Sequence, residues 1–217
     1  MNQVKSTIHL KNTEQKKKAA QLVAELKKLY PEAKTVLRHA DPWELYIAVV
    51  LSAQTTDKKV NEVTERLFKK YKTLDDYVNA DPEAFEREIK SVNFYRNKAK
   101  SILRAAKIVK EQFAGKVPRT MEALRTLPGA GRKTANVIQA QAYGVAEGIA
   151  VDTHVKRLAR RWGLTNETDP DKIERDLMAI LPEEEWVHFN FRVVDYGRDY
   201  CPARPHPHEA CPLSRFG

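Results

Sequence analysis

The residue that is best suited to take part in a chemical reaction is Lys133, which follows two closely spaced glycines in the segment LPGAGRKTANV. The pattern predicts a tight hairpin that leads straight into a helix, and Lys133 falls in the first turn of that helix. There its charge meets the unfavourable end of the helix dipole, and partial burial would disfavour the charged form further. A neutral lysine amine is a nucleophile that can attack a sugar carbon. A lysine that only binds phosphate is the alternative on this residue alone.

The two glycines, Gly129 and Gly131, can take positive φ angles and let an anion approach bare backbone. The N–H groups of the turn and the positive end of the following helix would point at that anion, which suits a phosphate. Such contacts carry no information about base sequence. A glycine cap that joins two packed helices explains the same glycines, and it is the favoured interpretation of the glycine pattern alone.

A carboxylate, Asp152, lies nineteen positions after the lysine in the segment IAVDTH. Its apolar lead-in predicts that Asp152 is the N-cap of a helix. The same carboxylate could stabilise positive charge on a sugar as a base departs, or help to deprotonate the lysine. One residue can serve both purposes.

The elements that must position these residues are predicted to be helices. Apolar residues recur at the i, i+3, i+4 and i+7 spacing of amphipathic helices, and no stretch shows the period-2 alternation of strands. A first helix, with Asn12 or Thr13 as its cap, should end at Pro31. Further helix starts are indicated by four aspartates: Asp41, Asp57, Asp81 and Asp169. We expect an all-α fold of about ten short helices.

The composition favours a polyanionic partner. Lysine and arginine outnumber acidic residues 38 to 29, which is compatible with nucleic-acid binding without demonstrating it. No apolar run reaches the roughly 20 residues that a membrane span needs, and the polar N-terminus lacks the apolar core of a secretory signal. Two cysteines do not make a disulfide framework. We expect an intracellular, cytoplasmic protein with no membrane partner.

Four ordered blocks of the chain together resemble the endonuclease III family of helix-hairpin-helix base-excision DNA glycosylases. They are ELYIAVVLSAQTTD, NFYRNKAKSI, LPGAGRKTANV and IAVDTH. The resemblance implies a bifunctional DNA glycosylase and abasic-site lyase for damaged pyrimidines, with Lys133 and Asp152 as its catalytic residues. Lys133 would attack C1′ of a flipped nucleotide, and the resulting Schiff base would permit β-elimination that nicks the strand on the 3′ side.

The resemblance also implies two α-helical lobes with a DNA-binding cleft between them. Residues 34–146 would form a six-helix barrel that carries the helix-hairpin-helix. Residues 1–33 and 147–217 would form a discontinuous bundle of the N-terminal helix and the C-terminal helices. The partner would be double-stranded DNA with damaged bases or abasic sites, bound by a monomer associated with the nucleoid.

Individual roles come from the same resemblance. Gln54 matches the position that fills the gap left by the extruded base, and Phe94 the position whose apolar side chain wedges into the stack. Base flipping costs a few kcal/mol, which inserted side chains partly offset. His154 matches a pocket position, although a structural hydrogen bond would explain it equally well. The DNA contacts expected from the hairpin are Leu127, Gly129, Gly131, Arg132 and Thr134.

The C-terminal segment CPARPHPHEACPLSRFG departs from the family, whose members mostly hold a [4Fe–4S] cluster with C-x6-C-x2-C-x5-C spacing. Cys201 and Cys211 occupy the first and third positions, while His208 and Gly217 stand at the second and fourth. Because such clusters usually need four thiolates, we expect no iron–sulfur cluster. We expect no other metal or cofactor, since the implied mechanism needs none. Zinc on Cys201, His208 and Cys211, with or without His206, is a less favoured alternative because the spacing matches no standard zinc knuckle. A second alternative is that a cysteine has been lost from the end of the tail, although His208 would still be a substitution.

Two further points bear on function. Asn93 stands just before Phe94, where relatives often have glycine, so the loop backbone should be less permissive.

A mismatch-specific thymine or uracil glycosylase of the same superfamily is an alternative function, because the sequence does not show the shape of the base pocket. A non-catalytic helix-hairpin-helix DNA-binding protein would explain the charge and the glycines, but not the match of Asp152, Gln54 and Phe94 to family positions.

Overall fold

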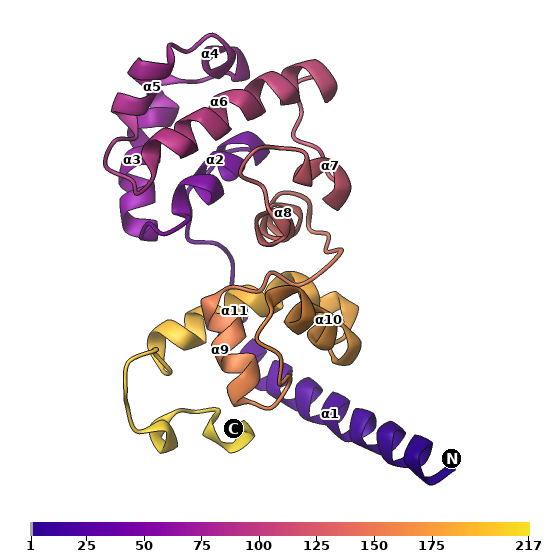
Figure 1. The fold of residues 1–217 in the computed structure, drawn as a ribbon. Coiled ribbons are helices and arrows are strands. Elements are labelled where there is room, and N and C mark those ends of the chain that lie inside the picture. Colours follow the sequence, from indigo (N-terminus) through magenta and orange to yellow (C-terminus); the bar gives the residue numbers. More distant parts are fainter. Residues whose placement is uncertain (1) are drawn as a thin grey trace. The chain divides into compact units, whose positions relative to one another are not determined.

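The fold, described by a computed structural model for residues 2–217 and for side chains from Thr13 onward, is built from helices. No strand occurs among the described residues, which confirms the all-α prediction. The chain divides into two compact units (Figure 1). Thr35–Glu147 forms one, here called the hairpin unit. The residues up to Lys34 and Gly148–Gly217 form the other, here called the terminal unit.

The hairpin unit is organised around one buried helix, α2. Eight of its eleven residues are buried, as its almost wholly apolar sequence predicts. The other helices of the unit pack against it or against one another, and α8 continues into a π-helical turn, η1. The elements are α2 (Pro42–Ser52), α3 (Asp57–Lys70), α4 (Leu74–Val78), α5 (Pro82–Glu88), α6 (Tyr95–Gln112), α7 (Met121–Arg125), α8 (Arg132–Ile138) and η1 (Gln139–Tyr143).

The cap of α2 shows how closely the helix starts follow the sequence. Asp41 Oδ1 accepts a hydrogen bond from the N–H of Glu44 at 2.8 Å, as the Asp-Pro signal predicts. The Glu44 carboxylate accepts from the N–H of Ala40 at 2.6 Å, one residue before the cap. For α3 the prediction was wrong by one residue, because Thr56 is the N-cap and Asp57 is the first helical residue.

The terminal unit joins the N-terminal helix to the last third of the chain. Its elements are α1 (Asn2–Leu29), α9 (Thr153–Arg161), α10 (Pro170–Ile180), η2 (Glu183–Glu185), α11 (Trp186–Asp199), η3 (His208–Ala210) and η4 (Ser214–Phe216). Leu22 and Leu26 of α1 share one apolar core with Trp162, Leu177 and Phe189. Burial of these side chains is what holds the two distant segments of the sequence together.

α1 begins earlier than its apolar pattern indicates. The helix runs without a break through Asn12 and Thr13, so the expectation that one of them caps it is wrong. Polar residues of adequate helix propensity extend a helix beyond the part that a core requires. No helix in the described part of the chain is both long enough and apolar enough to cross a bilayer.

Candidate active site

The hairpin between α7 and α8 is a tight turn over Leu127–Ala130. The N–H of Ala130 donates to the carbonyl of Leu127 at 3.0 Å, and Gly129, the third residue of the turn, has φ +86°. A proline in the second position and a left-handed glycine in the third are the features of a type II turn. Gly129 therefore takes the positive φ that we expected. Gly131 does not, because it is the extended N-cap of α8 with φ −71°.

Two helices brace this turn within the hairpin unit. The hydroxyl of buried Tyr46 on α2 donates to the carbonyl of Pro128, and burial raises the pKa of the Tyr46 phenol. A Cβ added to Gly129 would lie 3.4 Å from both methyl groups of Val50 and 3.5 Å from the Cβ of Ser101 on α6. The turn is thus pressed against α2 and α6, and its position is set by the core.

The face of the hairpin that precedes α8 is open. Gly131 is exposed, and apart from its neighbours in the chain no atom lies within 4 Å of the position that a Cβ there would take. No side chain from the described residues caps α8. Lys133, the second residue of α8, is exposed beside it. The first turn of α8 can therefore offer its N–H groups to an anion. Since Lys133 is exposed, the partial burial that we considered for it in the sequence is not found.

The other hairpin residues differ in what they can contact. Arg132 and Thr134 are partly exposed in the first turn of α8. Leu127 is buried, with 1% of its surface exposed. Its side chain belongs to the core of the hairpin unit, so only its backbone is available to DNA.

The two glycines predict different outcomes on substitution by alanine. Gly129→Ala forces a side chain into the left-handed region and against Val50, and should lower the free energy of unfolding by about 1–3 kcal/mol. Gly131→Ala meets open space, so stability should change by about 1 kcal/mol or less, while its methyl group obstructs an approaching phosphate and weakens DNA binding. Urea denaturation and a duplex-binding titration measure both. Equal stability of the two variants would contradict the assignment of the turn.

Two exposed loops of the same unit carry Gln54 and Phe94. Among the described residues, only Gln54, Phe94 and Ala114 are non-glycines with positive φ. The values at Gln54 and Phe94 are 55° and 57°, and Phe94 is 61% exposed. Left-handed backbone at bulky residues is costly, and a phenyl ring in solvent gains nothing from burial in the fold. Both features are compatible with the contact with DNA that the sequence predicts for these two residues.

Asn93 links these two loops. Its side-chain N–H donates to the carbonyl of Gln54 at 2.5 Å, and its backbone N–H donates to Thr55 Oγ1 at 3.3 Å. The left-handed residue of the loop is Phe94, whereas Asn93 has a negative φ. An asparagine at this position therefore does not hinder the loop backbone, and its side chain holds Gln54 and Phe94 in one assembly.

Lys98 on α6 strengthens the same assembly and was missed in the sequence. Its ammonium donates to the carbonyls of Leu51 and Ala53 at 2.8 and 2.6 Å, and to Thr55 Oγ1 at 3.2 Å. It is only 6% exposed, and burial lowers its pKa. A signal was present, because Lys98 stands at helical spacing in the apolar stripe of Ile102, Ala105 and Val109.

Lys98→Met should therefore destabilise the protein although it keeps an apolar stem of similar length. Loss of three hydrogen bonds leaves the carbonyl of Leu51 buried without its donor, which should lower the free energy of unfolding by about 2–4 kcal/mol. Lys107→Met, at an exposed position of the same helix, is the matched control. Urea denaturation compares the two, and equal stabilities would show that Lys98 does not hold the loops.

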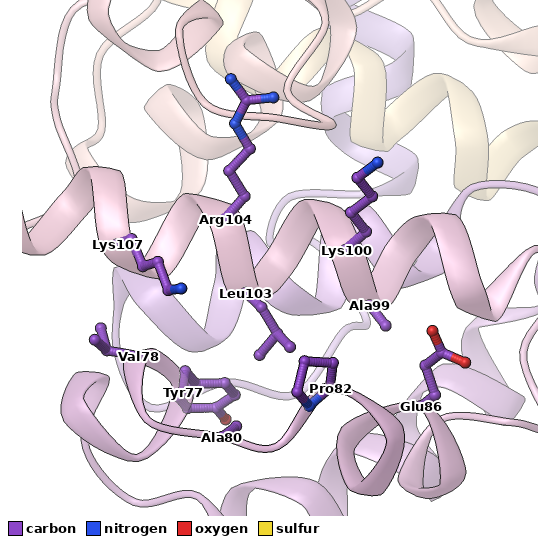
Figure 2. A pocket seen from close by; sticks show the side chains of 10 residues that line it. All are labelled: Tyr77, Val78, Ala80, Pro82, Glu86, Ala99, Lys100, Leu103, Arg104 and Lys107. Carbon is purple, nitrogen blue, oxygen red and sulfur yellow. The ribbon is translucent and has the colours of Figure 1, made fainter.

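A separate pocket of about 400 Å³ lies between α6 and the segment of α4 and α5. Figure 2 shows Tyr77, Pro82 and Leu103 gathered at its apolar floor, while Lys100 and Arg104 extend away from them. The α6 residues that line it face away from the side that carries Lys98. No predicted site residue contributes to its walls, so we do not assign it to the candidate site.

Asp152 begins α9 in the terminal unit, as predicted. Its Oδ1 accepts a hydrogen bond from the N–H of Val155 at 2.9 Å. The cap engages Oδ1 only, so Oδ2 lies outside it, and the residue is partly exposed. One carboxylate oxygen therefore orients the residue, and the cap leaves the other available for a further interaction.

The segment that leads to Asp152 is held by two buried polar side chains. The N–H of Ile149 donates to Glu174 Oε1 at 3.1 Å, and Asn190 Nδ2 donates to the carbonyl of Ala150 at 2.8 Å. Both Glu174 and Asn190 are buried. Because buried hydrogen bonds are costly to leave unmade, these two contacts restrict where the segment can lie.

His154 packs inside the terminal unit. A Cβ on Gly197 of α11 would come within 2.4 Å of its Nδ1, so the ring lies directly over that glycine. His154 therefore has a packing role, whatever it contributes to DNA binding. Among the predicted residues, Gln54 and Phe94 lie in one assembly of the hairpin unit. Lys133 belongs to the same unit, and Asp152 and His154 belong to the terminal unit.

The sequence is similar to those of known DNA repair proteins. Residues 47–183 match the family described as "HhH-GPD superfamily base excision DNA repair protein". The chain is 46% identical to Endonuclease III of Synechocystis sp., covering 92% of the chain and 91% of the relative, and 44% identical to Endonuclease III of Bacillus subtilis, covering 85% and 84%.

A solved structure gives the same result. The fold is similar to "Structure of a Trapped Endonuclease III-DNA Covalent Intermediate: Estranged-Adenine Complex", with a TM-score of 0.87, 42% identity, and 93% and 94% of the two chains covered. The extent of the sequence match and of the structural match both confirm the family that the four sequence blocks indicated. The chain belongs to the endonuclease III family of HhH-GPD base excision DNA repair proteins.

Proposed function

We propose that this protein is a bifunctional DNA glycosylase and abasic-site lyase that removes damaged pyrimidines from duplex DNA during base excision repair. The observation that carries the proposal is an exposed lysine, Lys133, in the first turn of the helix that follows an open glycine hairpin. Membership of the endonuclease III family supports the same activity. We further propose that the protein acts as a monomer at the nucleoid, in the cytoplasm.

DNA binding begins with the phosphates. The open backbone at Gly131 and the N-terminal turn of α8 offer N–H donors and the positive end of a helix dipole to one phosphate. A formal net charge of +9 adds a general attraction for the polyanion. These contacts position the duplex and leave recognition of the damaged base to other groups.

The damaged nucleotide then leaves the stack. Phe94 is already exposed, so it loses little contact with the fold by inserting between bases. Gln54, which is hydrogen-bonded to Asn93 beside Phe94, would fill the space of the extruded base. Insertion of an apolar side chain partly offsets the few kcal/mol that unstacking costs. The hydrogen bonds from Lys98 to the backbone before Gln54 oppose a displacement of this loop when the duplex binds.

The chemistry follows in two steps. The Lys133 amine attacks C1′ while the N-glycosidic bond breaks, and the electron pair of that bond leaves with the base, which takes up a proton. Asp152 stabilises positive charge on the sugar and accepts the proton released from the attacking amine. The opened sugar forms a Schiff base with Lys133. Loss of a C2′ proton then breaks the C3′–O bond and expels the 3′ phosphate.

A panel of duplex oligonucleotides tests the function. It should contain an abasic site, thymine glycol, dihydrouracil, uracil and a mismatched thymine at one position. We expect strand nicking at the abasic site and at the oxidised or reduced pyrimidines. Action on mismatched thymine or uracil alone would favour the mismatch-specific alternative. Binding without any base release or nicking would favour the non-catalytic alternative.

A further inference from the structure

Four side chains with metal-binding atoms converge in the C-terminal tail of the terminal unit. The Sγ atoms of Cys201 and Cys211 and one ring nitrogen each of His206 and His208 all lie within 4.8 Å of one another. Both cysteines are buried and both histidines are partly buried. The chain brings them together because it leaves α11 after Asp199, passes Cys201 and His206, and turns through η3 to Cys211.

These residues do not fit the [4Fe–4S] cluster that the family implies. Such a cluster requires about four thiolates, and the sequence contains two cysteines in all. His206, moreover, lies at no position of the family's cysteine spacing. The donor set is two thiols and two imidazoles, so this tail must be judged on its own chemistry.

The distances match a single tetrahedral ion. Zinc lies about 2.3 Å from thiolate sulfur and about 2.0–2.1 Å from imidazole nitrogen, so neighbouring ligand atoms around a tetrahedral zinc are about 3.3–3.8 Å apart. Here His208 Nδ1 lies 3.7 Å from Cys201 Sγ, and His206 Nε2 lies 3.4 Å from Cys211 Sγ. These two distances fall within that range, and none of the other distances between the four atoms exceeds 4.8 Å.

The pairing of the ligands favours one ion over two. In a [2Fe–2S] centre with two cysteines and two histidines, the cysteines bind one iron and the histidines bind the other. In this tail each cysteine instead lies beside a histidine, Cys201 with His208 and Cys211 with His206. All four atoms also fall within the same 4.8 Å, which suits a mononuclear site.

Neighbouring groups orient two of the four ligand residues through hydrogen bonds. His206 Nδ1 lies 2.8 Å from the carbonyl of Arg204, so it donates its proton there and leaves the lone pair of Nε2 facing Cys211. A ligand histidine in proteins is commonly oriented in this way. Arg157 donates to the carbonyl of Cys201 at 2.6 Å, and its Nη1 donates to the sulfur of Cys201 at an N–S distance of 3.6 Å.

We propose that Cys201, His206, His208 and Cys211 bind one Zn²⁺ ion, which fastens the C-terminal tail at the place where relatives carry an iron–sulfur cluster. Four protein ligands close the coordination sphere, so the role of the ion is structural. Sequence spacing left the fourth ligand in doubt, and His206 supplies it. The proposal is independent of the proposed glycosylase activity.

Metal content of the full chain tests the proposal directly. The protein should be produced with both zinc and iron in the medium, dialysed, and measured by elemental mass spectrometry. We expect one zinc per chain and iron far below stoichiometry. Stoichiometric iron, or neither metal, would overturn the proposal.

Substitutions identify the ligands. His206→Gln and Cys211→Ser should each lose most of the zinc, whereas His39→Gln should keep it. His39 is a matched control because its Nδ1 also lies 2.9 Å from a backbone carbonyl, that of Leu37, but it is not part of the cluster. Undiminished zinc in both ligand variants would contradict the assignment.

A spectroscopic measurement on the parent protein covers the case in which the variants fail to fold. After removal of zinc, Co²⁺ should bind and give the strong visible bands of a tetrahedral ion together with a near-ultraviolet thiolate charge-transfer band. Weak bands typical of six-coordinate Co²⁺, without thiolate charge transfer, would refute a site of two cysteines and two histidines.

Discussion

Lys133→Gln is expected to lower the rate of strand nicking at an abasic site by at least about 10³-fold, because glutamine offers no amine to form the Schiff base. The substitution should leave the fold intact, since Lys133 is exposed on the second residue of α8. Single-turnover nicking of an abasic duplex, with a parallel measurement of duplex binding, gives the effect on chemistry apart from the effect on affinity.

Lys58→Gln is the matched control for this prediction. Lys58 is also exposed and is also the second residue of a helix, α3. It should lose the same charge at the same position of a helix dipole without loss of nicking. If Lys133→Gln nicked as fast as Lys58→Gln, another residue would have to be the nucleophile.

Asp152→Asn has the second largest expected effect. The substitution removes the negative charge that stabilises positive charge on the sugar as the base departs. The rate of base release should therefore fall by about 10²–10⁴-fold. Asparagine caps a helix as well as aspartate does, so α9 should still begin at Thr153 and the protein should remain as stable as the parent. Single-turnover release of a damaged pyrimidine and a thermal melt measure the two quantities.

Asp169→Asn provides the comparison. Asp169 caps α10 in the same unit, accepting from the N–H of Lys172 at 3.0 Å, just as Asp152 caps α9. Both variants should therefore be equally stable, and only Asp152→Asn should lose activity. Similar activity in the two variants would leave Asp152 with a capping role alone.

The parts of the fold that follow from local sequence could be predicted well. At Asp41, Asp81 and Asp169 the side chain accepts a hydrogen bond from the backbone N–H three residues later, and this starts the helix. The turn at Gly129 likewise depends on its neighbours in the sequence. These contacts span a few residues, so their signals are visible in the sequence. The error at Asp57 arose because Thr56, directly before it, can also cap a helix and does so here.

The rest required contacts between distant residues. Lys98 meets backbone oxygens more than forty residues earlier in the chain, and the ring of His154 lies over Gly197. Nothing in the spacing of these residues shows that they meet. The convergence of His206 on Cys211 depends on the path of an irregular segment, which no periodic pattern describes.

Borohydride trapping tests the central claim most directly. The parent protein is incubated with a duplex that contains an abasic site, the Schiff base is reduced, and the covalent complex is digested and mapped by mass spectrometry. We predict that the nucleotide is attached to Lys133, and that Lys133→Gln gives no trapped complex. Attachment to any other residue, or equal trapping of Lys133→Gln, would contradict the proposed mechanism.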